Sequence, residues 1–184
     1  MTTPSNSRTR PRLLPVAAAA AAVLTVPLLA GCGDDEADAV SGPIEITAVD
    51  YAFVGVPERA TVGATLTMTN DSDVEIHEVV AVRLPDDEER PVSELVQLPP
   101  DQLAAFFPGV ETVLIAPPGA EGFPVEGTGE LTQPGRYALI CVIPTGADPD
   151  EYLAAAAESE GGPPDVAGGA PHIAEGMFAE LVVE

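Results

Sequence analysis

Two stretches near the carboxyl end decide the fold: PGRYALICVIP at residues 134–144 and PHIAEGMFAELVV at residues 171–183. Each contains a short apolar segment bounded by Gly or Pro, which is typical of a buried β-strand. The first stretch carries Cys141, and the second carries His172 and Met177 in an H-x4-M pattern. This part of the chain therefore combines two predicted strands with three side chains that suit a soft metal ion.

The same alternation of short apolar segments with Gly and Pro extends over residues 44–184 and predicts an all-β sandwich. The segment 79–82 is apolar throughout, which indicates a strand buried on both faces, whereas residues 121–129 are predicted to be loop. The predicted strands are residues 44–49, 60–62, 64–69, 77–84, 112–116, 130–132, 136–143 and 178–183.

Two helical excursions interrupt the predicted strands. The first, residues 85–109, contains a short helix at 93–98 and a helical turn at 101–107. The second lies between the last two strands, where Asp148 is a predicted N-cap and Pro149 occupies the first helical position. An alanine-rich segment follows and ends at a Gly pair, which predicts a helix over 148–160.

The amino-terminal segment predicts export and lipidation. Residues 1–31 contain three arginines, a long apolar run and no acidic residue, as in a signal peptide. Cys32 ends the tetrapeptide LAGC, which resembles the lipobox of bacterial lipoproteins, so Cys32 is the predicted lipidation site. The alternative is an uncleaved transmembrane helix. Residues 32–43 then form a lipidated acidic tether, and we expect the domain to lie outside the cytoplasm, anchored to the cell membrane.

The charge of the mature chain limits its partners. All seven basic residues are arginines, and four of them follow Cys32 against 30 acidic residues, a net charge of 4 − 30 = −26. A nucleic-acid partner is therefore excluded, and membrane contact would come from the lipid on Cys32. Such acidity favours either solubility alone or steering of a cationic partner, and both readings stay open. We expect a monomer.

The few histidines, cysteines and methionines occur in a suggestive order. His77 and His172 are the only histidines, and Cys141 is the only cysteine besides Cys32. With Met177 they give the ligand list of a blue-copper site: two imidazoles, a thiolate and a weak axial thioether. The alternative is structural, with Cys141 and Met177 as core residues and the histidines as hydrogen-bonded strand-end and loop residues.

The motifs also resemble a known family. ITAVDYAF (46–53), IHEVV (76–80) and the two carboxyl-terminal stretches are similar to segments of cupredoxins, the plastocyanin and azurin superfamily. The resemblance covers residues 44–184 and implies a Greek-key β-sandwich. It implies one type 1 copper ion bound by His77, Cys141, His172 and axial Met177. It also implies that His172 is the more exposed imidazole, through which electrons enter or leave.

One feature departs from the family pattern. Thirty residues separate Cys141 from His172, whereas the best-known cupredoxins have a handful. The entropic cost of a longer loop grows only logarithmically, so the insertion does not forbid a site. If the excursion folds outward and its ends return together, the ligand loop stays intact; if it packs across the end of the sandwich, His172 is displaced.

These observations favour a lipid-anchored, extracytoplasmic blue copper protein that carries electrons to a redox partner protein. The alternatives are a copper-free cupredoxin-fold lipoprotein that acts as an interaction or ligand-binding module, and a copper delivery protein. We do not expect an enzyme, because two histidines cannot build the additional copper sites of the oxidases in this superfamily. The chain also lacks a serine nucleophile motif and a phosphate-binding glycine loop.

Overall fold

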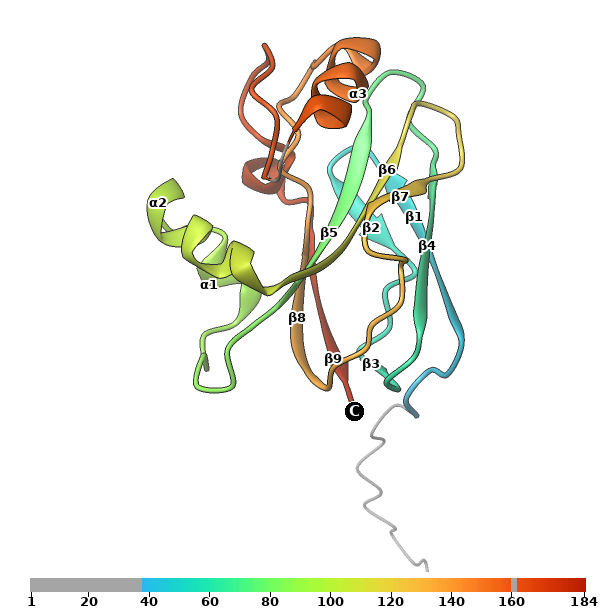
Figure 1. Cartoon of the computed structure of the whole chain (residues 1–184), viewed down its shortest axis with the longest axis vertical. Coiled ribbons are helices and arrows are strands. Elements are labelled where there is room, and N and C mark those ends of the chain that lie inside the picture. Colours follow the sequence, from blue (N-terminus) through green and yellow to red (C-terminus); the bar gives the residue numbers. More distant parts are fainter. Residues whose placement is uncertain (1–37, 160–161) are drawn as a thin grey trace, which may run out of the picture. The chain divides into compact units, whose positions relative to one another are not determined.

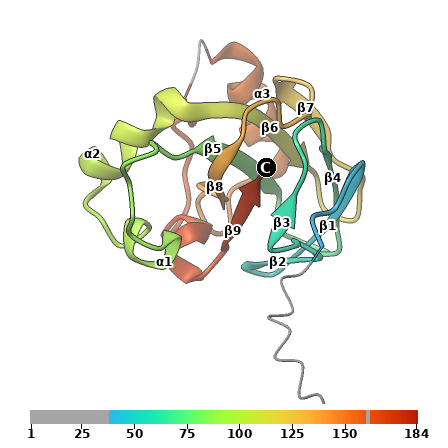
Figure 2. The same ribbon diagram turned by 90° about the horizontal axis from the view of Figure 1, so that it is seen from below.

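The computed structural model describes residues 38–159 and 162–184, which form two β-sheets packed face to face (Figures 1 and 2). The smaller sheet has the strand order β2-β1-β4 and the larger sheet the order β3-β9-β8-β5-β6-β7. The smaller sheet consists of β1 (Pro43–Val49), β2 (Ala52–Val54) and β4 (Thr65–Asn70). The larger sheet consists of β3 (Arg59–Ala60), β5 (His77–Arg83), β6 (Val110–Ala116), β7 (Phe123–Glu126), β8 (Gly135–Ile140) and β9 (Phe178–Val183). The predicted β-sandwich is confirmed.

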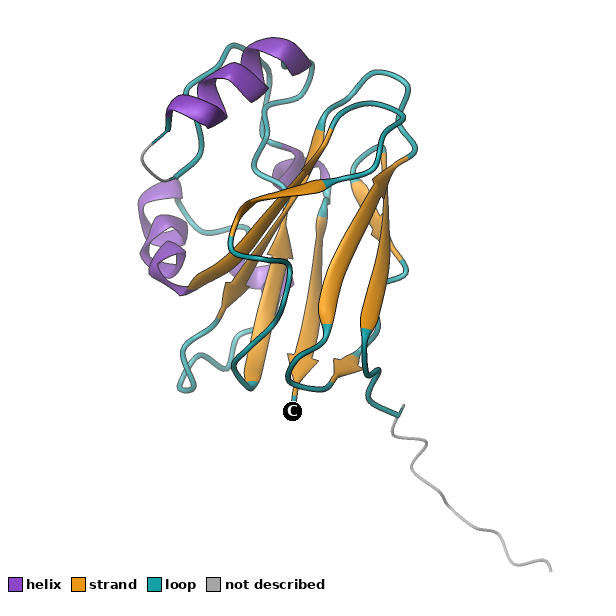
Figure 3. Ribbon diagram, turned by 45° about the vertical axis from the view of Figure 1, so that its right-hand side comes forward, coloured by secondary structure: helices purple, strands orange, loops and turns teal. Residues whose placement is uncertain are grey.

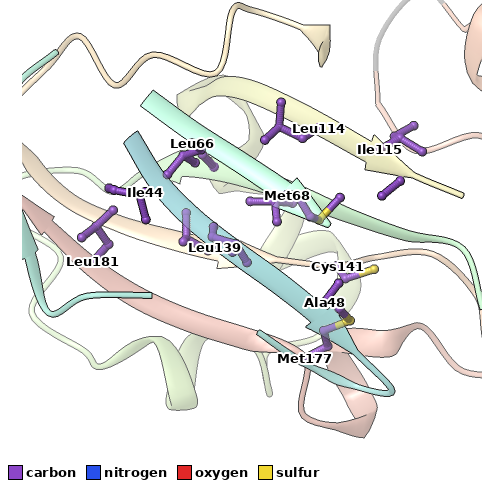
Figure 4. Close-up of a cluster of buried hydrophobic side chains, with 14 of the residues drawn as sticks. Ile44, Ala48, Leu66, Met68, Leu114, Ile115, Leu139, Cys141, Met177 and Leu181 are labelled. Atoms are coloured by element: carbon purple, nitrogen blue, oxygen red, sulfur yellow. The ribbon is translucent and has the colours of Figure 1, made fainter. Parts of the chain in front are cut away.

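The core between the sheets follows from residue alternation. In β1 and β4 every second side chain is buried, and the two strands pair in parallel with Ile46 opposite Met68. Successive side chains of a strand point to opposite faces, so the intervening threonines and glutamate face outward. Figure 4 shows aliphatic side chains of both sheets meeting in this core, with the sulfur-bearing side chains of Met68, Cys141 and Met177 among them.

Strand β5 is buried on both faces, as predicted for its apolar run. Val79 and Ala81 join the core between the sheets, whereas Val80 and Val82 join a second apolar cluster on the outer face of the larger sheet. Six of its seven residues are buried. A strand covered on both sides needs a near-continuous apolar sequence, and this one is interrupted by a single acidic residue, Glu78.

Strand β2 was not predicted, and two further local predictions were wrong. Residues 123–126 were predicted as loop, yet they form strand β7 at the edge of the larger sheet. All four of its residues are exposed and one is Pro124, so burial does not alternate along it and the proline argues against a strand. Conversely, residues 130–132 form no strand; Glu130 makes an isolated bridge to Thr65.

The first excursion, residues 85–109, covers the outer face of the larger sheet (Figure 3). It contains the helices α1 (Val92–Leu95) and α2 (Pro100–Leu103) and the 3₁₀ helix η1 (Ala104–Gly109), close to the predicted helical segments. Its apolar side chains pack on those of β5 and β8. The excursion therefore supplies the cover that the outer face of β5 requires.

The second excursion folds outward as a lobe, here residues 146–168. Helix α3 (Pro149–Glu158) begins as predicted, with the Asp148 carboxylate accepting hydrogen bonds of 3.0 Å from the backbone N–H groups of residues 150 and 151. At the base, Thr145 N–H donates to Ala170 O at 2.9 Å and Gly169 N–H donates to Thr145 O at 2.8 Å. The two ends of the lobe thus return together, which is the condition for an intact ligand loop.

The predictions for the amino terminus lie largely outside the described residues. This applies to the signal peptide at 1–31, to the lipidation site Cys32 and to most of the tether at 32–43. Within the tether, Val40 pairs with Ala60 in an isolated parallel bridge. In the part of the chain that the structure describes, no helix is both long and apolar enough to cross a membrane.

Candidate metal centre

Backbone pairing brings the three predicted ligands to one end of the larger sheet. His77 is the first residue of β5, and Cys141 directly follows β8, the strand that pairs with β5. His172 begins the 3₁₀ helix η2 (His172–Glu175) on the return from the lobe. His172 N–H donates to Ile143 O at 2.9 Å, and Ile173 N–H donates to Cys141 O at 2.8 Å. The returning chain is therefore held directly against the cysteine segment.

The side chains of these residues converge on one point. The Nδ1 atoms of His77 and His172 lie 3.1 Å apart, and Cys141 Sγ lies 3.3 Å from His172 Nδ1. One donor atom from each residue lies within 4.8 Å of the others, and all three residues are 0 % exposed. The predicted convergence is confirmed despite the thirty-residue insertion.

The spacing of the donor atoms fits a bound metal ion. Donors held about 2.0–2.3 Å from one ion in a trigonal arrangement lie about 3.5–3.7 Å apart. The observed separations of 3.1 and 3.3 Å are slightly shorter, so a small outward movement of the side chains suffices. Two facing Nδ1 atoms cannot both donate a proton to each other, whereas both can offer a lone pair to a cation between them.

Burial sets the protonation of the donors. Desolvation, followed by the neighbouring His172, lowers the pKa of His77 to about 4. Desolvation also lowers the pKa of His172, although Glu75 opposes this shift. Both imidazoles are therefore neutral near pH 7, with lone pairs available. Desolvation, followed by the charge of Glu78, raises the pKa of the Cys141 thiol, so a cation must displace its proton on binding.

Met177 lies beside Cys141 and is fully buried (Figure 4). Cys141 N–H donates to Met177 O at 3.2 Å, and Met177 N–H donates to His172 O at 3.0 Å. Gly176, which precedes it, has a φ of 111°, a left-handed conformation that closes the turn between His172 and Met177. The H-x4-M spacing thus corresponds to one compact turn, and the axial role of Met177 stays a prediction.

The expectation that His172 is the exposed imidazole was wrong. The ring of His172 is fully buried. Tyr51 contacts it edge-on, with ring centroids 5.1 Å apart, and Glu75 Oε2 lies 3.4 Å from Nε2. An electron that leaves through this ring must therefore cross protein atoms before it reaches the surface.

Sequence reasoning missed the polar residues around the donors. Glu78 is only 4 % exposed, and its carboxylate accepts hydrogen bonds of 3.1 Å from Val142 N–H and from the Tyr152 hydroxyl. Its backbone N–H points to Cys141 Sγ at 3.5 Å. Burial raises the pKa of Glu78 to about 7 despite these two donors. The available signal was an acidic residue inside a strand predicted to be buried on both faces.

Comparisons with known proteins give the following likenesses. No protein-family model matches the chain, and no curated protein matches its sequence. Among solved structures, it is similar to dithionite-reduced auracyanin from Roseiflexus castenholzii at 20% identity, over 80% of this chain and 99% of that one, with a TM-score of 0.45. It is also similar to auracyanin B, at 19% identity, 78% and 88% coverage and a TM-score of 0.41.

A third similar structure is auracyanin A from Chloroflexus aurantiacus, described as a "blue" copper protein. The identity is 18%, the alignment covers 79% of this chain and all of that one, and the TM-score is 0.41. The centre of the present chain contains a buried thiol and two neutral imidazoles whose donor atoms face one another.

Proposed function

We propose that this domain binds one copper ion through His77 Nδ1, Cys141 Sγ and His172 Nδ1, with Met177 as a weak axial ligand, and that it carries electrons. The observation that carries the proposal is the convergence of the three donor atoms in a fully buried position. When bound, copper supplies a one-electron couple. The chain holds the donors in one arrangement that both oxidation states can use.

The donor set favours copper over other common metals. Thiolate and thioether ligands select soft ions such as copper, whereas calcium and magnesium require oxygen ligands. A structural zinc site takes four nitrogen, sulfur or carboxylate donors, and the cluster among the described residues offers two histidines and one cysteine. Two imidazoles and one thiolate with a buried methionine alongside are the donors of a blue-copper centre.

Burial of the centre supports electron transfer instead of substrate chemistry. All three donor residues are 0 % exposed, so a substrate would have to open the structure to reach the metal. An electron needs no such opening, because it can pass through the protein atoms that cover the donors. We therefore propose a carrier and not an enzyme.

The cellular setting follows from the amino terminus and the charge. We propose that Cys32 carries a lipid, that the domain lies outside the cytoplasm at the cell membrane, and that it acts as a monomer. The charge of 4 − 30 = −26 after Cys32 favours a redox partner protein with a cationic docking face.

The direct test uses residues 36–184, which form a compact unit of their own. On addition of Cu(II), we expect an intense visible thiolate-to-copper charge-transfer band. Cys141→Ser should abolish it, and Met177→Leu should shift it. Met68→Leu is the matched control, because Met68 is a buried methionine of β4 in the core, and this variant should keep the unshifted band.

A colourless protein whose Cys141 is still alkylated after copper addition would contradict the proposal and favour an interaction module. Rapid loss of bound copper to a Cu(I) chelator would instead indicate copper delivery.

A further inference from the structure

The outer edge of the His172 ring is covered by a small polar assembly, here called the cap: the side chains of Tyr51 and Glu75 and the backbone N–H of Gly146. Glu75 Oε2 lies 3.4 Å from His172 Nε2, within the range of an ion pair, although the angle is not that of a normal hydrogen bond. Tyr51 packs edge-on against the same ring at an interplanar angle of 64°. The cap is therefore in direct contact with one predicted ligand.

The chemistry of imidazole explains why this edge needs an acceptor. A neutral ring carries one proton, so a ring that offers its Nδ1 lone pair to a metal carries the proton on Nε2. His172 Nε2 is buried, and a buried N–H without an acceptor is costly. Glu75 supplies the nearest carboxylate. Among residues 38–159 and 162–184 neither His172 Nε2 nor His77 Nε2 forms a hydrogen bond of normal geometry, but His172 Nε2 has a carboxylate oxygen within ion-pair distance and His77 Nε2 has none.

Glu75 is itself held on several sides. Its Oε1 accepts from the Tyr51 hydroxyl at 3.3 Å, and Gly146 N–H donates to its two carboxylate oxygens at 3.1 and 3.0 Å. Its backbone is bonded as well: Asn70 Nδ2 donates to Glu75 O at 2.8 Å, and Glu75 N–H donates to Ser72 Oγ at 3.0 Å. A carboxylate fixed by both its head and its backbone can hold a histidine ring in one orientation.

Tyr51 adds evidence that the cap is a built feature. It is the one non-glycine residue with positive φ, 62°, in the part of the chain that the structure describes. This conformation is disfavoured for residues with a Cβ atom and persists only where the surroundings hold it. Here it places the tyrosine ring on His172 and its hydroxyl on Glu75.

We propose that Glu75, braced by Tyr51 and Gly146, is the positioning residue of His172. It accepts the Nε2 proton and so keeps the Nδ1 lone pair directed at Cys141. Because no carboxylate of the described residues makes such a contact with His77, the two imidazoles of the centre differ in basicity. The part of this inference that concerns reduction potential rests on the proposed copper site, whereas the part that concerns the tautomer does not.

The tautomer is tested in metal-free protein, residues 36–184, by ¹⁵N NMR of the histidine rings near pH 7. We expect His172 to carry its proton on Nε2. Glu75→Gln keeps an oxygen acceptor and should keep this tautomer, whereas Glu75→Leu should shift His172 to a mixture or to the Nδ1–H form. An unchanged His172 tautomer in folded Glu75→Leu would overturn the proposal, and this result needs no metal.

The reduction potential is tested in the copper-loaded protein. A carboxylate against one ligand stabilises Cu(II) relative to Cu(I), so Glu75→Gln should raise the equilibrium constant for reduction about tenfold, which corresponds to 59 mV for one electron. Glu175→Gln is the matched control: this carboxylate also lies close enough to influence the pKa of His172, yet it forms no hydrogen bond or ion pair with the ring. Equal shifts in the two variants would overturn the direct role of Glu75.

Tyr51→Phe provides a second, milder variant. It removes the hydroxyl that holds Glu75 and keeps the ring that packs on His172. We expect a shift of the potential in the same direction and of smaller size. A protein that shows the expected tautomers but binds no copper would refute the proposed function and leave the positioning role of Glu75 intact.

Discussion

Both excursions pack on the sandwich through apolar side chains, and the second adds a buried polar contact beside the candidate metal centre. The first, residues 85–109, packs on the larger sheet through apolar side chains, including Val92, Leu95 and Phe106. The lobe, residues 146–168, is tied to the sheet near the candidate metal centre by a buried polar contact between Tyr152 and Glu78. We therefore expect the first excursion to affect stability alone and the lobe to affect the position of the donors as well.

The polar contact of Tyr152 is linked through Glu78 to the predicted copper ligand Cys141. Tyr152 is 1 % exposed and its hydroxyl donates to Glu78 Oε2, while the backbone N–H of Glu78 points to Cys141 Sγ. The other Glu78 oxygen accepts from Val142 N–H, next to the cysteine. A cavity of about 500 Å³ lies beside this contact, lined by both excursions, including Phe107 and Ala156. The excursions thus meet the sheet at neighbouring places and act on it differently.

The largest expected effect is a loss of stability caused by a substitution in the first excursion. Leu95 is 2 % exposed in the cluster under α1, and Leu95→Ala leaves a cavity there. We expect a loss of about 3 kcal/mol in the free energy of unfolding, measured by denaturant titration. The copper charge-transfer band should not change. Glu94→Ala, an exposed position of the same helix, is the control and should cost little; a band shift in Leu95→Ala would contradict the division of roles.

A smaller effect is expected on the pH dependence of the unfolding free energy of the metal-free protein. It arises from Glu78, the residue that the lobe contacts through Tyr152. The pKa of Glu78 is raised to about 7 in the folded protein, above its unfolded value, mainly by burial. Between the unfolded pKa and about 7 the folded state binds more protons than the unfolded state, so this group makes stability fall as pH rises. The pKa of His77 is lowered to about 4 and has the opposite effect, so the slope must be isolated by a variant.

Glu78→Gln provides that isolation, because the histidines are common to both proteins. The unfolding free energy of the variant relative to wild type should increase between pH 4.5 and 7 by about 2 kcal/mol. The measurement is denaturant unfolding at several pH values. A difference that does not vary with pH would show that Glu78 keeps an ordinary pKa in the folded protein.

The smallest expected effect distinguishes a role of the Tyr152 contact in positioning the donors from a role in stability alone. Tyr152→Phe removes the hydroxyl from the Glu78 carboxylate and should cost about 1.5 kcal/mol while shifting the charge-transfer band. Tyr137→Phe is the matched control, because Tyr137 is an equally buried tyrosine of β8 whose hydroxyl bonds to Glu111 and to Gln133 O. It should lose similar stability and keep the band. Equal spectra in the two variants would mean that the Tyr152 contact is structural only.

The fold was predictable where burial is regular. β9 coincides with the predicted segment 178–183, and β1 and α3 begin within one residue of the predicted positions, because alternation and the Asp148-Pro149 cap are local signals. β7 was missed, since an exposed edge strand has no alternation to read. Residues 130–132 were wrongly predicted as a strand, because three residues are too few to show a period.

The candidate site was predictable in its members and not in its surroundings. His77, Cys141 and His172 stood out because histidine and cysteine are rare in this chain. Tyr51 and Glu75 carry no such signal, since 30 acidic residues hide the one that faces a histidine. Glu78 was detectable in principle as an acidic interruption of an apolar strand.

The sequence by itself determined the donor types, their order and the alternation that builds two sheets, because these depend on residue chemistry and on a local period of two. Only the tertiary structure decided that the donors meet within 3.1 and 3.3 Å and that the His172 ring is covered. The physical reason is that His77 and His172 are 95 residues apart. Their separation depends on strand order, on closure of the lobe at its base and on the packing of Tyr51 and Glu75, and none of these is a local property of the chain.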